Sequence, residues 1–227
     1  TPSRSSYFGI VDLCGFPKDR YYNYKSYWCP DVPTVHILPH WNWEERIGKI
    51  TPVHIYTSGD AVELFLNGKP LGRREKIHSY DRLTWDDVHY EPGVLKAVAY
   101  KNGQKWAEEV VETTGKPAAL QVTPEKTVLK NDGTDLSFIR VAIVDSKGRA
   151  VPRSKNHLKF SVSGPAEIVA TDNGDATSLL PFQLSERDAY NGLALVILRG
   201  KYMEQGKVIL TVESKGLPKQ KVILKVK

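Results

Sequence analysis

The sequence predicts an all-β protein made of two β-sandwiches in tandem, with one short helix before them. From residue 51 onward, apolar and polar residues alternate with the period of two that is typical of half-buried strands. Asn67-Gly68 and Asn102-Gly103 each fit a two-residue hairpin turn, because that turn needs positive φ at both positions. Gly115-Lys116-Pro117 lies between two such series of strands and predicts a linker.

The helix is predicted close to the start of the chain. Pro17 suits the first position of a helix, where a backbone N–H is not needed. Tyr21, Tyr24 and Trp28 then recur at spacings of three and four residues, until Cys29-Pro30 ends the pattern. These three rings form one stripe, and no other long amphipathic helix is predicted to cover it. We therefore expect the stripe to dock to a body of protein outside this chain.

The first sandwich is predicted over residues 34–115. Its strands are expected at residues 35–38, 53–57, 61–66, 69–74, 94–101 and 104–113. After the linker, a second sandwich is predicted over residues 116–227. About seven strands, the number typical of an immunoglobulin-like sandwich, are expected at residues 120–122, 137–145, 158–162, 167–171, 193–199, 207–212 and 221–226.

Three tryptophans are candidates for contact with a sugar. Trp41 and Trp43 are two residues apart, so in an extended chain they would face the same side and could stack on a sugar ring. Packing beside a domain junction is the favoured interpretation of this pair. Trp85 precedes Asp86 and Asp87, a composition that is also found in sugar-binding clefts. Adjacent carboxylates in a strand point to opposite faces, however, so Asp86 and Asp87 cannot form a catalytic pair.

No metal site or cofactor is predicted. His36 and His40 are four residues apart, but Pro39 denies them the helix that would bring both to one zinc ion. The run from Asp172 to Asp175 has calcium-like composition and lacks the rest of a 12-residue binding loop. Cys14 and Cys29 are the only cysteines. The sequence leaves open whether they are free thiols or form one disulfide.

Charge is distributed unevenly along the chain. The formal net charge is +6; residues 1–116 hold 15 basic and 15 acidic residues, whereas residues 117–227 hold 17 and 11. The lysines of the second half are scattered, without interleaved stacking aromatics, so a solvated surface is favoured over a nucleic-acid interface. No apolar run is long enough to predict insertion into a membrane.

The segment SSYFGIVDLCGFPKDRYYNYKSYW resembles the end of the catalytic (β/α)8 barrel in glycoside hydrolase family 2, the β-galactosidase-like enzymes of gut Bacteroidetes. VELFLNGKPLG resembles a hairpin of the immunoglobulin-like domains that flank these barrels. LQVTPEKTVLKNDGTDLSFIRVAIVDSKGRAVP is similar to bacterial immunoglobulin-like domains of the invasin class. The resemblance implies that residues 1–33 are a remnant of the barrel end and precede the two sandwiches.

The resemblance also implies what the chain does. In such enzymes two glutamates carry the chemistry, one of them in an Asn-Glu dipeptide, and this sequence contains no Asn-Glu. We expect no catalytic residues here and no hydrolysis by this chain alone. The expected role is that of accessory domains that support the barrel of the same polypeptide, in a periplasmic or secreted parent. The alternatives are a carbohydrate-binding module that uses Trp41, Trp43 or Trp85, and an adhesin-like spacer.

Overall fold

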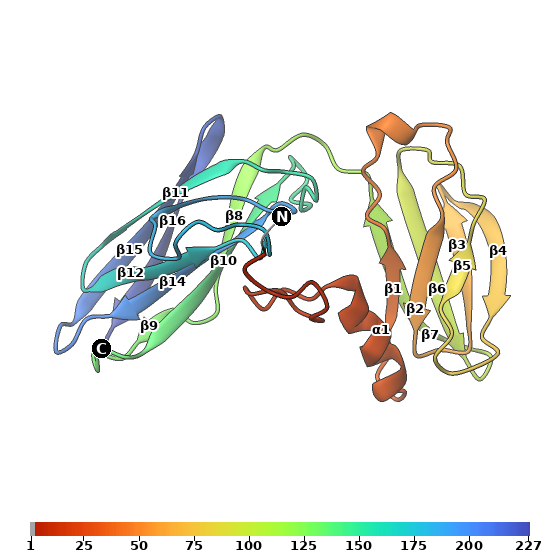
Figure 1. Cartoon of the computed structure of the whole chain (residues 1–227), viewed down its shortest axis with the longest axis horizontal. Coiled ribbons are helices and arrows are strands. Elements are labelled where there is room, and N and C mark those ends of the chain that lie inside the picture. Colours follow the sequence, from red (N-terminus) through yellow and green to blue (C-terminus); the bar gives the residue numbers. More distant parts are fainter. Residues whose placement is uncertain (1–2) are drawn as a thin grey trace. The chain divides into compact units, whose positions relative to one another are not determined.

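The computed structural model describes residues 3–227, and β-strands dominate it (Figure 1). The all-β class is confirmed. Contacts divide the described chain into two compact units, one of residues 17–114 and one that combines residues 3–16 with residues 115–227. The predicted barrel remnant, residues 1–33, is therefore not a unit of its own in this structure. It is split after Phe16 between the two sandwiches.

The first sandwich consists of two antiparallel sheets. One has the strand order β1-β2-β5, with β1 at Val35–Leu38, β2 at Val53–Thr57 and β5 at Leu83–Trp85. The other has the order β4-β3-β6-β7, with β3 at Ala61–Leu66, β4 at Lys69–Glu75, β6 at Val94–Lys101 and β7 at Gln104–Glu112. A 3-10 turn, η1, spans Glu44–Arg46 between β1 and β2.

Two tight turns set the register of the second of these sheets. Asn67 and Gly68 have φ of 50° and 80°, and Asn102 and Gly103 have φ of 51° and 75°. Positive φ at both positions is what a type I′ turn requires, so the two Asn-Gly hairpins join β3 to β4 and β6 to β7 as predicted. Between the sheets lies one apolar core that includes Trp41, Ile55, Val62, Leu64, Trp85, Tyr90 and Leu95.

Helix α1 spans Asp19–Trp28 and packs on β1 and β2 of the first sandwich. It begins two residues after Pro17, as expected for a proline that leads into a helix. Ser26 is the one residue of the helix that is buried. The sequence predicted a partner only outside the chain for this helix, whereas one of its faces covers the sandwich that follows it; the partner of the aromatic stripe stays a prediction.

The second sandwich also has two sheets. The first has the order β12-β14-β10-β8, with β8 at Ala119–Pro124, β10 at Leu136–Val144, β12 at Ala166–Asp172 and β14 at Leu193–Gly200. The second has the order β13-β11-β15-β16-β9, with β9 at Val128–Leu129, β11 at His157–Ser163, β13 at Glu186–Asp188, β15 at Gly206–Ser214 and β16 at Leu217–Val226. Alternating residues of both sheets, among them Ile139, Val141, Val196 and Leu210, fill the core.

Residues 3–16 run along the second sandwich without forming a helix or a long strand. The backbone N–H of Arg4 donates to the carbonyl of Ala176 at 2.7 Å, and the Arg4 guanidinium lies 4.3 Å from the centre of the Phe182 ring. Asp12 approaches Gly174 so closely that a Cβ at Gly174 would lie 2.0 Å from the Asp12 Oδ2 atom. Gly174 also has φ of +76°, so both the space and the backbone require glycine.

Candidate docking surface and a lysine-lined pocket

A histidine between two carboxylates holds helix α1 on the first sandwich. The Nε2 atom of His36, on β1, lies 2.8 Å from Oδ1 of Asp19 at the start of the helix. Its Nδ1 atom lies 3.4 Å from Oε1 of Glu109 on β7. Burial opposes the charged imidazolium, but the two carboxylates outweigh it and raise the pKa of His36 to about 9. At neutral pH, His36 is therefore a cation that joins three elements.

The inner face of the helix is completed by an aromatic stack. The Tyr22 ring lies parallel to the His36 imidazole, with 3.9 Å between the ring centres and 14° between the planes. Asp19, Tyr22 and Ser26 are three and four residues apart and so share one face of the helix. The sequence analysis missed this face, because it followed the aromatic spacing and not the polar partners of His36.

The predicted stripe lies on the other side of the helix. The Tyr24 and Trp28 rings stack with 4.6 Å between their centres, and Tyr27 meets both rings edge to face. Trp28 is 66% exposed. Tyr21 is half-buried and contacts Tyr22 edge to face. Docking of Tyr21, Tyr24 and Trp28 to a barrel stays a prediction, but the structure leaves Trp28 available for it.

A loop of the first sandwich adds apolar side chains next to the end of this helix. A pocket of about 300 Å³ is lined by Ser26 and Tyr27 of α1 on one side and by Ile77 and His78 on the other, so this loop and the helix are neighbours. Ile77 is 87% exposed. The Asp81 carboxylate accepts hydrogen bonds from the backbone N–H groups of Ile77 and His78, which fixes the loop. We refer to the stacked rings of Tyr24 and Trp28 as the aromatic patch.

The segment that packs on the second sandwich has exposed apolar residues of its own. Phe8 is 80% exposed and Tyr7 is 58% exposed, and Val11 and Leu13 are also exposed. Most single exposed apolar residues need no explanation, but several in one short segment mark an interaction site. Apolar side chains at the surface are thus concentrated in the stretch that resembles a barrel end.

Two of the three candidate sugar-binding tryptophans are core residues. Trp41 is 0% exposed and its Nε1–H donates to the carbonyl of Glu91, and Trp85 is 1% exposed. Neither ring presents a face on which a sugar could stack in this structure. The structure therefore does not support sugar contact by Trp41 or Trp85. The prediction assumed an extended chain through residues 41–43, whereas β1 ends at Leu38.

Trp43 lies nearer the surface than Trp41. It is half-buried, with the His40 ring stacked on it at 4.4 Å between centres, and its Nε1–H donates to the His40 carbonyl at 2.6 Å. Sugar contact by Trp43 stays a prediction. Asp86 and Asp87 are both exposed, and only Asp87 borders the pocket of about 240 Å³ next to Trp85.

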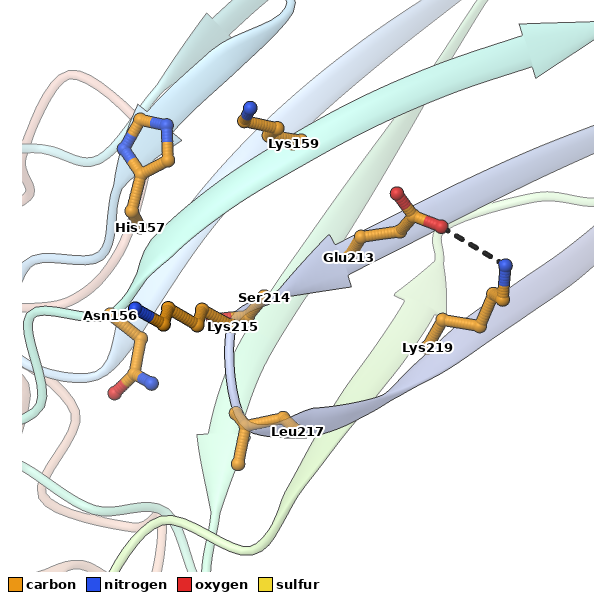
Figure 2. A pocket seen from close by; sticks show the side chains of 8 residues that line it. All are labelled: Asn156, His157, Lys159, Glu213, Ser214, Lys215, Leu217 and Lys219. Carbon is orange, nitrogen blue, oxygen red and sulfur yellow. Dashed lines mark hydrogen bonds and ion pairs between the residues drawn. The ribbon is translucent and has the colours of Figure 1, made fainter.

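A further pocket lies on the second sandwich, and Figure 2 shows its lining. It has a volume of about 770 Å³ and lies where the start of β11 faces the hairpin between β15 and β16. Its charged side chains are Lys159, Lys215, Lys219, His157 and Glu213, and its other lining residues are Asn156, Ser214 and Leu217. This pocket has no counterpart among the sites that the sequence analysis proposed.

The acidic groups at this pocket are engaged by cations. Glu213 Oε1 lies 3.2 Å from Nζ of Lys219. His157 lies 2.6 Å from Asp188 through Nδ1 and 3.3 Å from Glu186 through Nε2, and hydrogen bonds to these carboxylates raise the pKa of His157. Within residues 3–227 no ion pair involves Lys159 or Lys215, although Glu186 and Glu213 are the cross-strand neighbours of Lys159.

Residues 3–227 form no metal site and no disulfide. No cluster of three or more His, Cys, Asp or Glu side chains is arranged to hold a metal ion. Cys14 and Cys29 are free thiols, and burial raises the pKa of Cys14, with the nearby carboxylates of Asp172 and Asp12 adding to the shift. None of the described helices has the length and apolar character needed to span a membrane.

Both sandwiches match known protein families. Residues 120–223 match the glycoside hydrolase family 2 C-terminal domain 5, and residues 48–107 match a domain of unknown function, DUF4982. The chain is 41% identical over 225 residues to Beta-galactosidase BoGH2A of Bacteroides ovatus, in an alignment that covers 99% of this chain and 26% of that protein. It is 35% identical over 162 residues to a Beta-glucuronidase of Formosa agariphila, covering 70% of this chain and 16% of that protein.

Solved structures show the same relationship. A beta-glycosidase from Bacteroides vulgatus superposes with a TM-score of 0.92 at 36% identity, over 99% of this chain and 29% of that one. A glycosyl hydrolase family 2 member from Bacteroides cellulosilyticus superposes with a TM-score of 0.91 at 29% identity, over 96% of this chain and 31% of that one. The chain thus spans about a quarter to a third of the length of these Bacteroides proteins. It belongs to glycoside hydrolase family 2, and it corresponds to C-terminal accessory domains of that family's enzymes.

Proposed function

We propose that this chain supports the catalytic barrel of a larger polypeptide that hydrolyses β-galactosides, by docking to the barrel through the aromatic patch and through Tyr7 and Phe8. The observation that carries the proposal is the exposure of Phe8 and Trp28, 80% and 66%, within the segment that resembles a barrel end. Large rings in a short segment are seldom left in water unless a partner covers them.

The proposed partner is the part of the same polypeptide that lies outside this chain. The Bacteroides ovatus relative is about four times as long as the region matched here, since the match covers 26% of it. Covering a ring of this size contributes about 2 kcal/mol by removal of apolar surface from water. Two rings that are both covered would therefore hold a domain in place with several kcal/mol.

The chemistry would come from the larger polypeptide, because this sequence contains no Asn-Glu dipeptide. The relatives, a beta-galactosidase and a beta-glucuronidase, favour a β-linked glycoside as the substrate class. A galactoside is favoured among these, because the match to the beta-galactosidase covers 99% of this chain and the match to the beta-glucuronidase covers 70%.

The test compares substitutions in the full polypeptide and in this chain alone. The double change Phe8→Ala and Trp28→Ala should lower the Tm of the full polypeptide by several degrees and reduce its hydrolysis of an aryl β-galactoside. The Tm of the isolated chain should stay almost the same, because both rings are exposed in it.

The matched control is the double change Tyr202→Ala and Leu179→Ala. These side chains are also exposed, 69% and 58%, but lie outside the barrel-like segment, so neither the Tm nor the activity of the full polypeptide should change. If the Phe8 and Trp28 changes had no more effect on the full polypeptide than this control, the docking proposal would be wrong.

A further inference from the structure

The outer face of the sheet formed by β11, β15 and β16 has an excess of positive charge. Six lysines lie on its strands or in its hairpin and are exposed: Lys159, Lys207, Lys215, Lys219, Lys221 and Lys225. Lys207 and Lys225 are direct partners across β15 and β16, an arrangement that destabilises a sheet. The repulsion between these two lysines lowers the stability of the sheet, so the stability of the sheet does not explain why both are present.

The pocket gives this charge a defined shape. Lys159 lies between Glu213 on β15 and Glu186 on β13. Glu213 pairs with Lys219 at 3.2 Å and Glu186 with His157 at 3.3 Å, so other cations share both carboxylates and the charge balance at the pocket stays positive. Lys215 projects from the hairpin turn on the other side of the pocket (Figure 2). Two ammonium groups that approach one pocket, one from a strand and one from a hairpin turn, favour a ligand with a negative charge.

The remaining lining suits a ligand with hydroxyl groups. Ser154 donates to the Oδ1 atom of Asn156 at 2.6 Å, which leaves the amide N–H₂ of Asn156 as a donor. The Ser214 hydroxyl and the apolar Leu217 side chain also line the pocket. A volume of about 770 Å³ is within the usual range for pockets that bind small molecules and exceeds what a single inorganic anion fills.

We propose that this pocket binds an acidic saccharide, with Lys159 and Lys215 contacting the carboxylate or sulfate group of one sugar unit. Asn156 and Ser214 hydrogen bond to hydroxyls of the same saccharide, and Leu217 contacts its apolar face. Nucleic acid is disfavoured, because no Phe, Tyr or Trp side chain for base stacking lines the pocket. The proposal does not depend on docking to a barrel, because every residue in it belongs to the second sandwich.

Calorimetric titration of this chain with three oligosaccharides of equal length tests the proposal. The probes are an oligogalacturonate, which carries carboxylates, a sulfated galactan oligosaccharide, and a neutral galactan oligosaccharide. We expect one or both acidic probes to bind, with affinity that falls as salt is added, and the neutral probe to bind at least about tenfold more weakly. The comparison of the first two probes identifies which anionic group the site prefers.

The variant Lys159→Gln with Lys215→Gln should weaken binding of the acidic probe by about tenfold or more, the loss expected from two charged contacts. The control Lys130→Gln with Lys201→Gln removes the same charge from exposed positions of the same sandwich outside the pocket, and should change the affinity less than about twofold. Equal losses in both variants, binding of inorganic sulfate as tight as binding of the saccharide, or no binding of either acidic probe would overturn the proposal.

Discussion

The two tryptophans nearest the start of the first sandwich differ in burial although they are two residues apart. Trp41 lies in the core, 4.8 Å from the Tyr90 ring centre, whereas Trp43 is half-buried against His40. A period of two would have placed both on one face, but the chain is irregular after Leu38. Residue types and spacing alone could therefore not tell the core ring from the peripheral one.

This difference predicts the effect of truncating each ring. Trp41→Ala should lower the free energy of unfolding of the first sandwich by about 3–5 kcal/mol, because it leaves a cavity in a closed core. Trp43→Ala should cost less, since part of that ring already contacts water. Urea unfolding followed by tryptophan fluorescence measures both, and an unchanged midpoint for Trp41→Ala would contradict the packing described here.

Fluorescence is selective in this protein because all five tryptophans lie in one unit. Trp28, Trp41, Trp43, Trp85 and Trp106 fall within residues 17–114. Their signal therefore follows the first sandwich and its helix without a contribution from the second sandwich. The same signal can follow how helix α1 is held on that sandwich.

At the scale of elements, helix α1 shows how far periodicity could predict the structure. Its existence and its end near Cys29 followed from the sequence, but its inner face did not. That face depends on the ion contacts of His36 with Asp19 and Glu109, which join residues up to 90 positions apart in the chain. Likewise β9 and β13, of two and three residues, are too short for a periodic signal.

The pH dependence of stability tests this attachment. The folded pKa of His36, about 9, is higher than the usual value of 6.5, so the folded state binds the proton more tightly. The stabilisation is fully present below about pH 6.5 and is lost as the pH rises through about 9. We expect the first sandwich to lose on the order of 1–2 kcal/mol of stability from pH 6.5 to pH 10.

His36→Gln should reduce this loss, because glutamine cannot carry the proton. His157→Gln is the matched control: His157 also lies between two carboxylates, but it belongs to the second sandwich, so the fluorescence-detected pH dependence should persist. A His36→Gln protein with the same pH dependence as the unmodified chain would show that His36 is not its source.

At the scale of the whole molecule, the segment that resembles a barrel end belongs to two different units. Asp12 and Arg4 contact the second sandwich, through Gly174 and Phe182, while Asp19 and Tyr22 contact the first. The sequence could not predict this division, because it rests on contacts between residues more than 150 positions apart. The prediction that the segment is a surface for a larger partner is consistent with its exposed rings.

The central claim is that the exposed rings of this segment are covered in the full polypeptide. Hydroxyl-radical footprinting read by mass spectrometry compares the oxidation of Phe8 and Trp28 in the isolated chain and in the full polypeptide. Met203, which is 75% exposed on the second sandwich, serves as the internal reference. We predict that Phe8 and Trp28 react readily in the isolated chain and are protected in the full polypeptide, while Met203 reacts in both. Equal oxidation of Phe8 and Trp28 in the two proteins would contradict the account.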